Sequence, residues 1–283
     1  MRYAVSCVLN YDVQGNAPFV FNIEAQNTEH QKVLDETLTI SPQLAIERFD
    51  MPESGNRYFR LRAGPGPLKV EYRATVELTP ATFDPEAVQE VEPGRLPLEA
   101  LTHLYPSRYI ESDLLQQFAK REFGHLKPGY QRVAAIANWI CDNIDYVRGS
   151  SDESTSARDT LIQRQGVCRD FAHLGIAFCR GLGIPARFVS AYAWRLQPPD
   201  FHAVFEAWLE GPEGGAWFMF DPTRLADSDG LVRMGVGRDA AEVAFCSPYG
   251  EADCGSPKVR IEALDRDANT TKPTTRAVTL AAA

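Results

Sequence analysis

Three residues of this 283-residue chain have side chains that together could cleave or transfer an amide acyl group. Cys168 opens a run with helical periodicity, His202 opens a later run typical of a strand, and Asp221 closes the next strand-like run. A thiolate attacks carbonyl carbons, an imidazole transfers protons near neutral pH, and a carboxylate can orient the imidazole. In this chain order the three residues predict a thiol active site.

The position of Cys168 favours a reactive thiol. Gly166 lets the chain turn tightly into a helix predicted over 168–180, where free N–H groups and the positive dipole end stabilise a thiolate. The alternative is an inert core cysteine, the usual state of a free thiol. We expect that state for Cys141, beside an apolar helical stripe, and for Cys179, further along the same helix as Cys168.

His202 and Asp221 fall on two strands predicted over 201–209 and 216–221, around a turn at 211–215. This hairpin sets His202 opposite residues 222–224, so Asp221 lies within about one rung of it. We expect Asp221 to accept the Nδ1–H of the imidazole and to leave Nε2 free for the thiol proton. Asp221 and Pro222 could instead simply end a strand.

The elements around these residues indicate an α+β protein. Alternating and turn-bounded segments predict a small antiparallel β-sandwich in the first ~90 residues. Helical patterns follow a Pro- and Gly-rich boundary at 91–97, and strands follow those helices. The predicted N-terminal strands are 3–11, 20–26, 32–40, 58–62 and 68–78, and the predicted helices are 113–123, 128–144 and 168–180.

The resulting domain prediction has three parts. Residues 1–95 form the sandwich, residues 96–263 form the catalytic domain, and residues 264–283 form a flexible tail, because the tail carries few large apolar side chains.

Four runs, 166–173, 183–187, 202–203 and 220–223, closely resemble the bacterial transglutaminase-like family, which shares the papain-like cysteine protease core. The block 236–243 and the N-terminal β region resemble other parts of its members. The resemblance implies a papain-like/transglutaminase-like core preceded by a small antiparallel β-sandwich. It also implies that Cys168 is the nucleophile, His202 the general base and acid, and Asp221 the orienting carboxylate. Val204 stands where many members have Trp, a difference expected to affect the substrate groove.

Further matches to the family have structural rather than catalytic interpretations. We expect Asp170 and Arg187 to be buried or half-buried polar residues, and Arg238 and Asp239 to form a structural pair. Glu206 keeps its spacing of four residues from His202, which indicates an intact strand register. For the oxyanion hole the backbone N–H of Cys168 is the first candidate donor, because it lies at a helix N-terminus. Tyr146 and Gln165 are two candidates for the second donor.

Composition excludes several other classes. The formal net charge of −9 disfavours binding to nucleic acid or to an anionic membrane, and no run of 18 apolar residues predicts a membrane span. Residues 1–10 read as a first strand and not as a signal peptide, which favours a cytoplasmic location. The six cysteines are spread over the whole chain, so we expect no disulfide framework. No Cys-x-x-Cys pair, helically spaced His pair or EF-hand loop occurs, so we expect no metal, and we expect no cofactor.

Three functions remain open at this point. The leading one is hydrolysis of a peptide or side-chain amide in a peptide or protein substrate. The second is transglutaminase chemistry, in which an amine replaces water as acceptor after the same first half-reaction. The third is a noncatalytic scaffold with a relict site.

Overall fold

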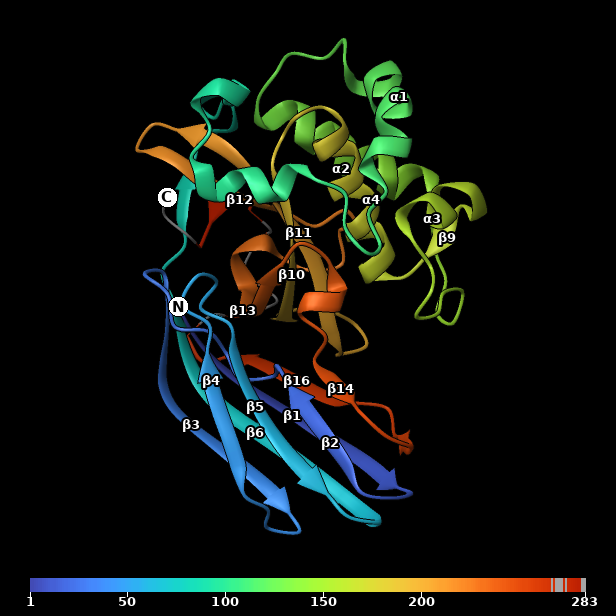
Figure 1. The fold of residues 1–283 in the computed structure, drawn as a ribbon. Coiled ribbons are helices and arrows are strands. Elements are labelled where there is room, and N and C mark those ends of the chain that lie inside the picture. The colour runs from blue at the N-terminus through green and yellow to red at the C-terminus, as the bar shows by residue number, and fades with distance from the viewer. Residues whose placement is uncertain (266, 268–271, 273, 281–283) are drawn as a thin grey trace.

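The computed structural model describes residues 1–265, 267, 272 and 274–280. It has two halves, an N-terminal β-sandwich and a mixed helical and sheet half that carries the candidate site (Figure 1). This confirms the predicted α+β class. Within the described part of the chain, no helix is long and apolar enough to cross a membrane.

The sandwich consists of two antiparallel sheets. One has the strand order β15-β1-β6-β3 with β16 also paired to β1, and the other has the order β14-β2-β5-β4. Side chains alternate between buried and exposed along β1 and β6, so one face of that sheet supplies the core. The bounds are β1 Arg2–Val13, β2 Ala17–Phe21, β3 Gln31–Ser41, β4 Ile46–Asp50, β5 Arg57–Ala63, β6 Gly66–Leu78, β14 Cys246–Pro248, β15 Ala252–Cys254 and β16 Lys258–Ala263.

The other half is built on a six-stranded sheet of order β13-β10-β11-β12-β17-β7. Helix α4 packs on β11 so closely that a Cβ at Gly175 would lie 2.5 Å from the ring of Phe205. The bounds are β7 Ala81–Phe83, α1 Ser112–Phe123, α2 Tyr130–Asn143, β8 Asp145–Tyr146, α3 Ala157–Gln163, β9 Gln165–Gly166, α4 Cys168–Gly181, β10 Ala186–Ala193, β11 Phe201–Gly211, β12 Gly214–Phe220, β13 Leu231–Gly237 and β17 Ala277–Thr279; short 3-10 turns cover Pro85–Ala87, Pro93–Arg95, Leu98–Leu104, Ser228–Gly230 and Ala240–Glu242.

The chain crosses the predicted domain boundaries. Strands β14, β15 and β16, which the prediction placed in the catalytic domain 96–263, pair with β2 and β1 of the sandwich. Strand β7, predicted as sandwich, pairs with β17 at the edge of the six-stranded sheet. The reason is non-local pairing: a strand joins whichever open edge its apolar face can cover, and local sequence does not specify that edge.

The predicted flexible tail is also partly corrected. Residues 277–279 form β17, which pairs with β12 and β7, and Ala277 to Leu280 are buried. Residues 266, 268–271, 273 and 281–283 of that tail lie outside the described residues. A short apolar segment is enough to close a sheet edge, although it is too short to stand out in composition.

The two halves share hydrogen bonds that resemble a strand pairing. The side-chain amide of Asn56 donates to Val236 O and accepts from Val236 N, both at 2.8 Å. The side-chain amide of Gln31 bonds Arg233 N and O in the same way, again at 2.8 Å. Sandwich side chains therefore satisfy the outer edge of β13. Tyr192 and Trp194 complete the contact by packing into the sandwich core.

Candidate active site

Cys168 is the first residue of α4, and the turn before it is held by Asp170. The Asp170 carboxylate is fully buried and accepts from the Val167 N–H at 2.8 Å. A Cβ at Gly166 would lie 2.8 Å from the Asp170 Cβ, so glycine is required there by close packing. The half-buried Cys168 thiol thus lies at a fixed helix N-terminus, where free N–H groups stabilise negative charge.

His202 and Asp221 meet as the hairpin predicted, but through the other ring nitrogen. His202 Nε2, not Nδ1, lies 2.9 Å from Asp221 Oδ2, and both side chains are buried. The physical reason is reach: Nε2 is the outer ring nitrogen, which can extend to the neighbouring strand end. Nδ1 is buried and makes no hydrogen bond, so it is the nitrogen left to exchange a proton with the thiol.

Asp221 is held from several directions. Its Oδ1 accepts from Thr223 N at 2.9 Å and from Thr223 Oγ1 at 2.7 Å, and its Oδ2 also accepts from Ala226 N at 3.1 Å. The contact from a side chain to the N–H two residues on is the Asx-turn that Asp-Pro sequences favour. The Asp221 carboxylate therefore both forms the turn that ends its strand and contacts the His202 ring.

The charges of the pair stabilise each other. Burial alone would lower the pKa of His202, but the charge and hydrogen bond of Asp221, followed by Cys168, raise that pKa to about 10. Burial alone would raise the pKa of Asp221, but the His202 charge and the hydrogen bonds from His202 and Thr223 lower it below its usual value. The pair therefore favours a cationic imidazole beside an anionic carboxylate.

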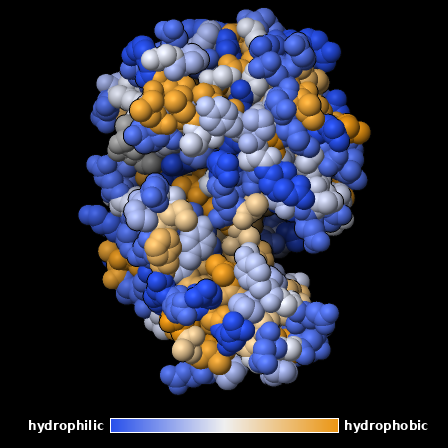
Figure 2. Space-filling model, in the orientation of Figure 1, coloured by the Kyte–Doolittle hydropathy of each residue, from blue (hydrophilic) through white to orange (hydrophobic). Residues whose placement is uncertain are grey.

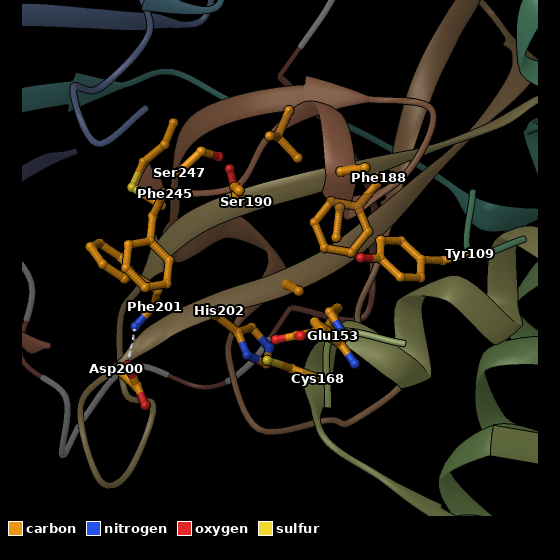
Figure 3. Close-up of a pocket in the computed structure, with 17 residues that line it drawn as sticks. Tyr109, Glu153, Cys168, Phe188, Ser190, Asp200, Phe201, His202, Phe245 and Ser247 are labelled. Carbon is orange, nitrogen blue, oxygen red and sulfur yellow. Dashed lines mark hydrogen bonds between the residues drawn. The ribbon is translucent and has the colours of Figure 1, made fainter. Parts of the chain in front are cut away.

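The Cys168 thiol and the His202 ring lie side by side at the edge of a cleft (Figure 3). They do not yet make a hydrogen bond of ordinary geometry, since His202 Nδ1 is unpartnered. Such contacts are often long before substrate is bound. The structure thus brings together all three residues that the sequence predicted.

Tyr146 and Gln165 lie on β8 and β9, which pair in parallel just before Cys168. Burial, and then the adjacent Cys168, raise the pKa of the Tyr146 phenol far above its usual value. Tyr146 also lines the cleft beside the thiol, whereas the structure gives Gln165 no place in that wall. The role of Tyr146 as an oxyanion donor stays a prediction.

Asp170 and Arg187 have the expected burial, whereas the exposed Arg238 does not form the expected pair. Asp170 is buried, and Arg187 bonds the fully buried Glu206 at 2.7 Å. Arg238, however, pairs with Glu242 at 2.6 Å and not with Asp239. The two neighbours point apart because Asp239 accepts from the backbone N–H groups of residues 109 and 241.

Val204 lies in a small core with Val189 and Met219 and not in the cleft. The neighbouring Ala203 is the residue of this pair that lines the cleft. The expected effect of Val204 on the substrate groove is therefore not borne out by its position.

Two hollows meet at Cys168. One, of about 490 Å³, extends from the thiol toward β14, and the other, of about 480 Å³, extends toward Tyr146 and Leu225. Both also include Asp200 and Phe201. The thiol thus borders two adjoining open hollows.

Several groups of the site were not identified from the sequence. Thr223 donates a hydrogen bond to Asp221. Its position two residues after an Asp is the sequence feature that could have predicted this contact. Phe201 adjoins His202 in sequence, but Phe188 and Phe245 come from distant segments that only the fold brings to the cleft.

Two family models match the chain. The transglutaminase-like superfamily core matches residues 116–222, and the bacterial transglutaminase N-terminal domain matches residues 1–97. The first of these ranges contains Cys168, His202 and Asp221.

Relatives extend the likeness over the whole chain. A crystal structure from Cytophaga hutchinsonii, described provisionally as a cysteine protease, has 40% identity, covers 99% of this chain and 97% of its own, and superposes with a TM-score of 0.92. An uncharacterised protein of Mycobacterium tuberculosis is 30% identical over 77% of this chain and 76% of its own. Another, from Mycobacterium leprae, is 37% identical over 40% of this chain and 42% of its own. The chain therefore belongs to the transglutaminase-like superfamily.

Proposed function

We propose that the chain is a thiol-dependent hydrolase that cleaves peptide or side-chain amide bonds. The observation that carries the proposal is the order of three groups: Asp221 bonds one nitrogen of His202, and the other nitrogen faces Cys168 at a helix N-terminus. This order supplies a nucleophile, a proton carrier and an orienting charge.

The first half-reaction uses each group once. The Cys168 thiolate attacks the carbonyl carbon, and the developing oxyanion is stabilised by N–H groups at the start of α4. The His202 imidazolium then protonates the amine nitrogen as its bond to carbon breaks. A thioester on Cys168 and a free amine result.

The second half-reaction consumes water. Neutral His202 takes a proton from water as its oxygen attacks the thioester, and the thiolate leaves. The carboxylic acid product departs and the imidazolium is restored. Asp221 keeps its charge throughout, because its pKa lies below its usual value and its four hydrogen bonds fix the carboxylate.

An open groove on both sides of the thiol supports hydrolysis, since water reaches the thioester without a gated channel. A transglutaminase would pass the same acyl group to a lysine amine. Incubation with a mixture of peptides and n-butylamine separates the two, because mass spectrometry distinguishes a new carboxylic acid from a new butylamide. We expect the acid to predominate, and a predominance of butylamide would replace hydrolase by transferase.

The matched variants for this assay are Cys168→Ala and Cys254→Ala. Cys254 is an exposed thiol of the sandwich, so its removal changes thiol content without touching the site. We expect turnover to vanish only in Cys168→Ala. Turnover that persists in Cys168→Ala would contradict the assignment.

A cytoplasmic location is part of the proposal. All six cysteines are free, and Cys168 must remain a reduced thiol to react. Fractionation of cells that carry the native gene tests this, and recovery in an exported fraction would contradict it.

A further inference from the structure

The hollow that extends from Cys168 toward β14 is largely apolar and is not used by the catalytic steps above. Its floor includes Phe188 of β10 and Met234 of β13. Its wall is the segment 240–247, which leaves the six-stranded sheet and returns to the sandwich, and which carries Phe245. In the space-filling view the surface is indented between the two halves (Figure 2).

An aromatic surface leads from the catalytic residues into this hollow. Phe201 directly precedes His202, and the Phe201 ring lies 5.0 Å from that of Phe245 (Figure 3). Phe245 remains 37% exposed and lines the hollow, so part of its apolar surface stays open there. Exposed apolar surface gathered in a concavity is typical of a binding site.

The charged residues of the hollow are Glu153, Arg169 and Asp200, and none of them is buried. The buried lining consists of Phe188, Met234 and Val243, together with His202, Ala203 and the Ser190 side chain. His202 is the one buried charged residue in this lining, and Asp221 already pairs with it. An apolar group can therefore enter the hollow without desolvating any other buried charge.

The sandwich holds both the floor and the wall of this hollow through Asn22. The Asn22 N–H donates to Phe245 O at 3.1 Å, and the Asn22 side-chain amide donates to Met234 O at 3.5 Å. Gly235 leaves room for it, since a Cβ there would lie 2.3 Å from Asn22 Oδ1. Pairing of β14 with β2, Cys246 opposite Phe21, continues the same attachment.

We propose that this hollow is the specificity subsite of the enzyme, that it takes a bulky apolar side chain of a peptide substrate, and that the N-terminal sandwich belongs to the site because the Asn22 side chain positions its floor. The inference rests on the proposed peptide-cleaving function. The volume of the hollow, about 490 Å³, falls within the range of roughly 300–1,000 Å³ that is usual for binding pockets.

A binding measurement tests this apart from turnover. The protein is the full chain with Cys168→Ala, and the probes are two fluorescein-labelled Gly/Ser octapeptides that differ by one central residue, Phe or Gly. We expect fluorescence anisotropy to show binding of the Phe peptide that is at least about tenfold tighter, because burial of the ring removes its apolar area from water. Equal affinity for both peptides would overturn the proposal. Absence of cleavage by the unmodified chain would instead contradict the proposed function.

Matched variants in the same background locate the subsite. Phe245→Ala should reduce the preference for Phe to less than about threefold. Tyr249→Ala removes another exposed aromatic ring, two residues beyond the segment 240–247 and outside the hollow, and should leave the preference intact. Equal effects of the two substitutions would overturn the location.

Asn22→Ala tests the part that the sandwich plays, because it removes the side-chain hydrogen bond to Met234 O in the floor and keeps the backbone bond to Phe245 O. We expect it to weaken the preference for Phe while the far-ultraviolet circular dichroism spectrum at the assay temperature stays that of the parent chain. A folded Asn22→Ala chain with an unchanged preference would overturn the role of the sandwich, and the Phe245→Ala result keeps the subsite itself testable.

Discussion

Thr223 Oγ1 donates to Asp221 Oδ1 at 2.7 Å, while Asp221 Oδ2 faces His202 Nε2 at 2.9 Å. The two carboxylate oxygens therefore have different partners: Oδ1 is held by its own turn, and Oδ2 faces the imidazole. The hydrogen bond from Ala226 N to Oδ2 further limits its rotation. The ring is held at Nε2, and Nδ1 is left for the thiol.

The different partners of the two Asp221 oxygens predict the effect of Asp221→Asn. The amide can keep the contacts of Oδ1 with Thr223, but its NH₂ group faces both Ala226 N–H and His202, and the negative charge is lost. We expect turnover to fall roughly 10- to 10³-fold, less than the ~10⁴-fold loss known for a serine-protease aspartate, because a thiolate–imidazolium pair can form before substrate binds. Steady-state kinetics measures this, and His202→Ala should cost more.

The same substitution should move the pH profile. Asp221 is the main source of the rise in the His202 pKa to about 10, so Asp221→Asn should bring that pKa back toward its ordinary value near 6.5. We expect the alkaline limit of activity to shift to lower pH in this variant. An unchanged alkaline limit would show that another group controls it.

Stability should also depend on His202. Its pKa is higher in the folded chain than in the unfolded one, so its contribution is complete below about pH 6.5 and is lost as pH rises toward 10. We expect this residue to lower the unfolding free energy over that window by at most about 1.4 kcal/mol per pH unit. Urea titrations at several pH values measure the slope, and His202→Gln should flatten it.

The hairpin that carries His202 and Asp221 could be predicted from the sequence because it is specified by local residues. A turn rich in Gly between two strand patterns fixes the register, and the register brings Asp221 to His202. The ring orientation could not be predicted, since it depends on which nitrogen reaches the carboxylate. The apolar hollow could not be predicted from the sequence either, because Phe188 and Phe245 come together only when the chain returns to the sandwich.

The contact between the halves predicts joint unfolding. Asn56→Ala would leave Val236 N and O without their 2.8 Å partners in a buried position, which costs about 1–3 kcal/mol for each group. We expect a lower Tm within a single calorimetric transition, while Asn10→Ala, at an exposed site, should leave Tm nearly unchanged. Two separate transitions in the parent chain would contradict a shared core.

Strand β17 predicts the effect of shortening the chain. Removal of residues 264–283 deletes β17 and exposes the edges of β7 and β12, so we expect a lower Tm and a greater tendency to aggregate. A chain that ends at Leu280 keeps β17 and is the control. Equal thermal stability of the two shortened chains would show that this strand contributes nothing.

The reactivity of Cys168 toward an alkylating reagent measures whether this thiol is activated as a nucleophile. Iodoacetamide at about pH 6 reacts slowly with ordinary thiols, whose pKa is ~8.5, and burial raises the pKa of the Cys179 thiol well above that. We expect one modification per chain, mapped to Cys168 by peptide mass spectrometry and slowed strongly by His202→Ala. Preferential labelling of Cys179 or another thiol, or labelling of Cys168 at the same rate with and without His202, would contradict it.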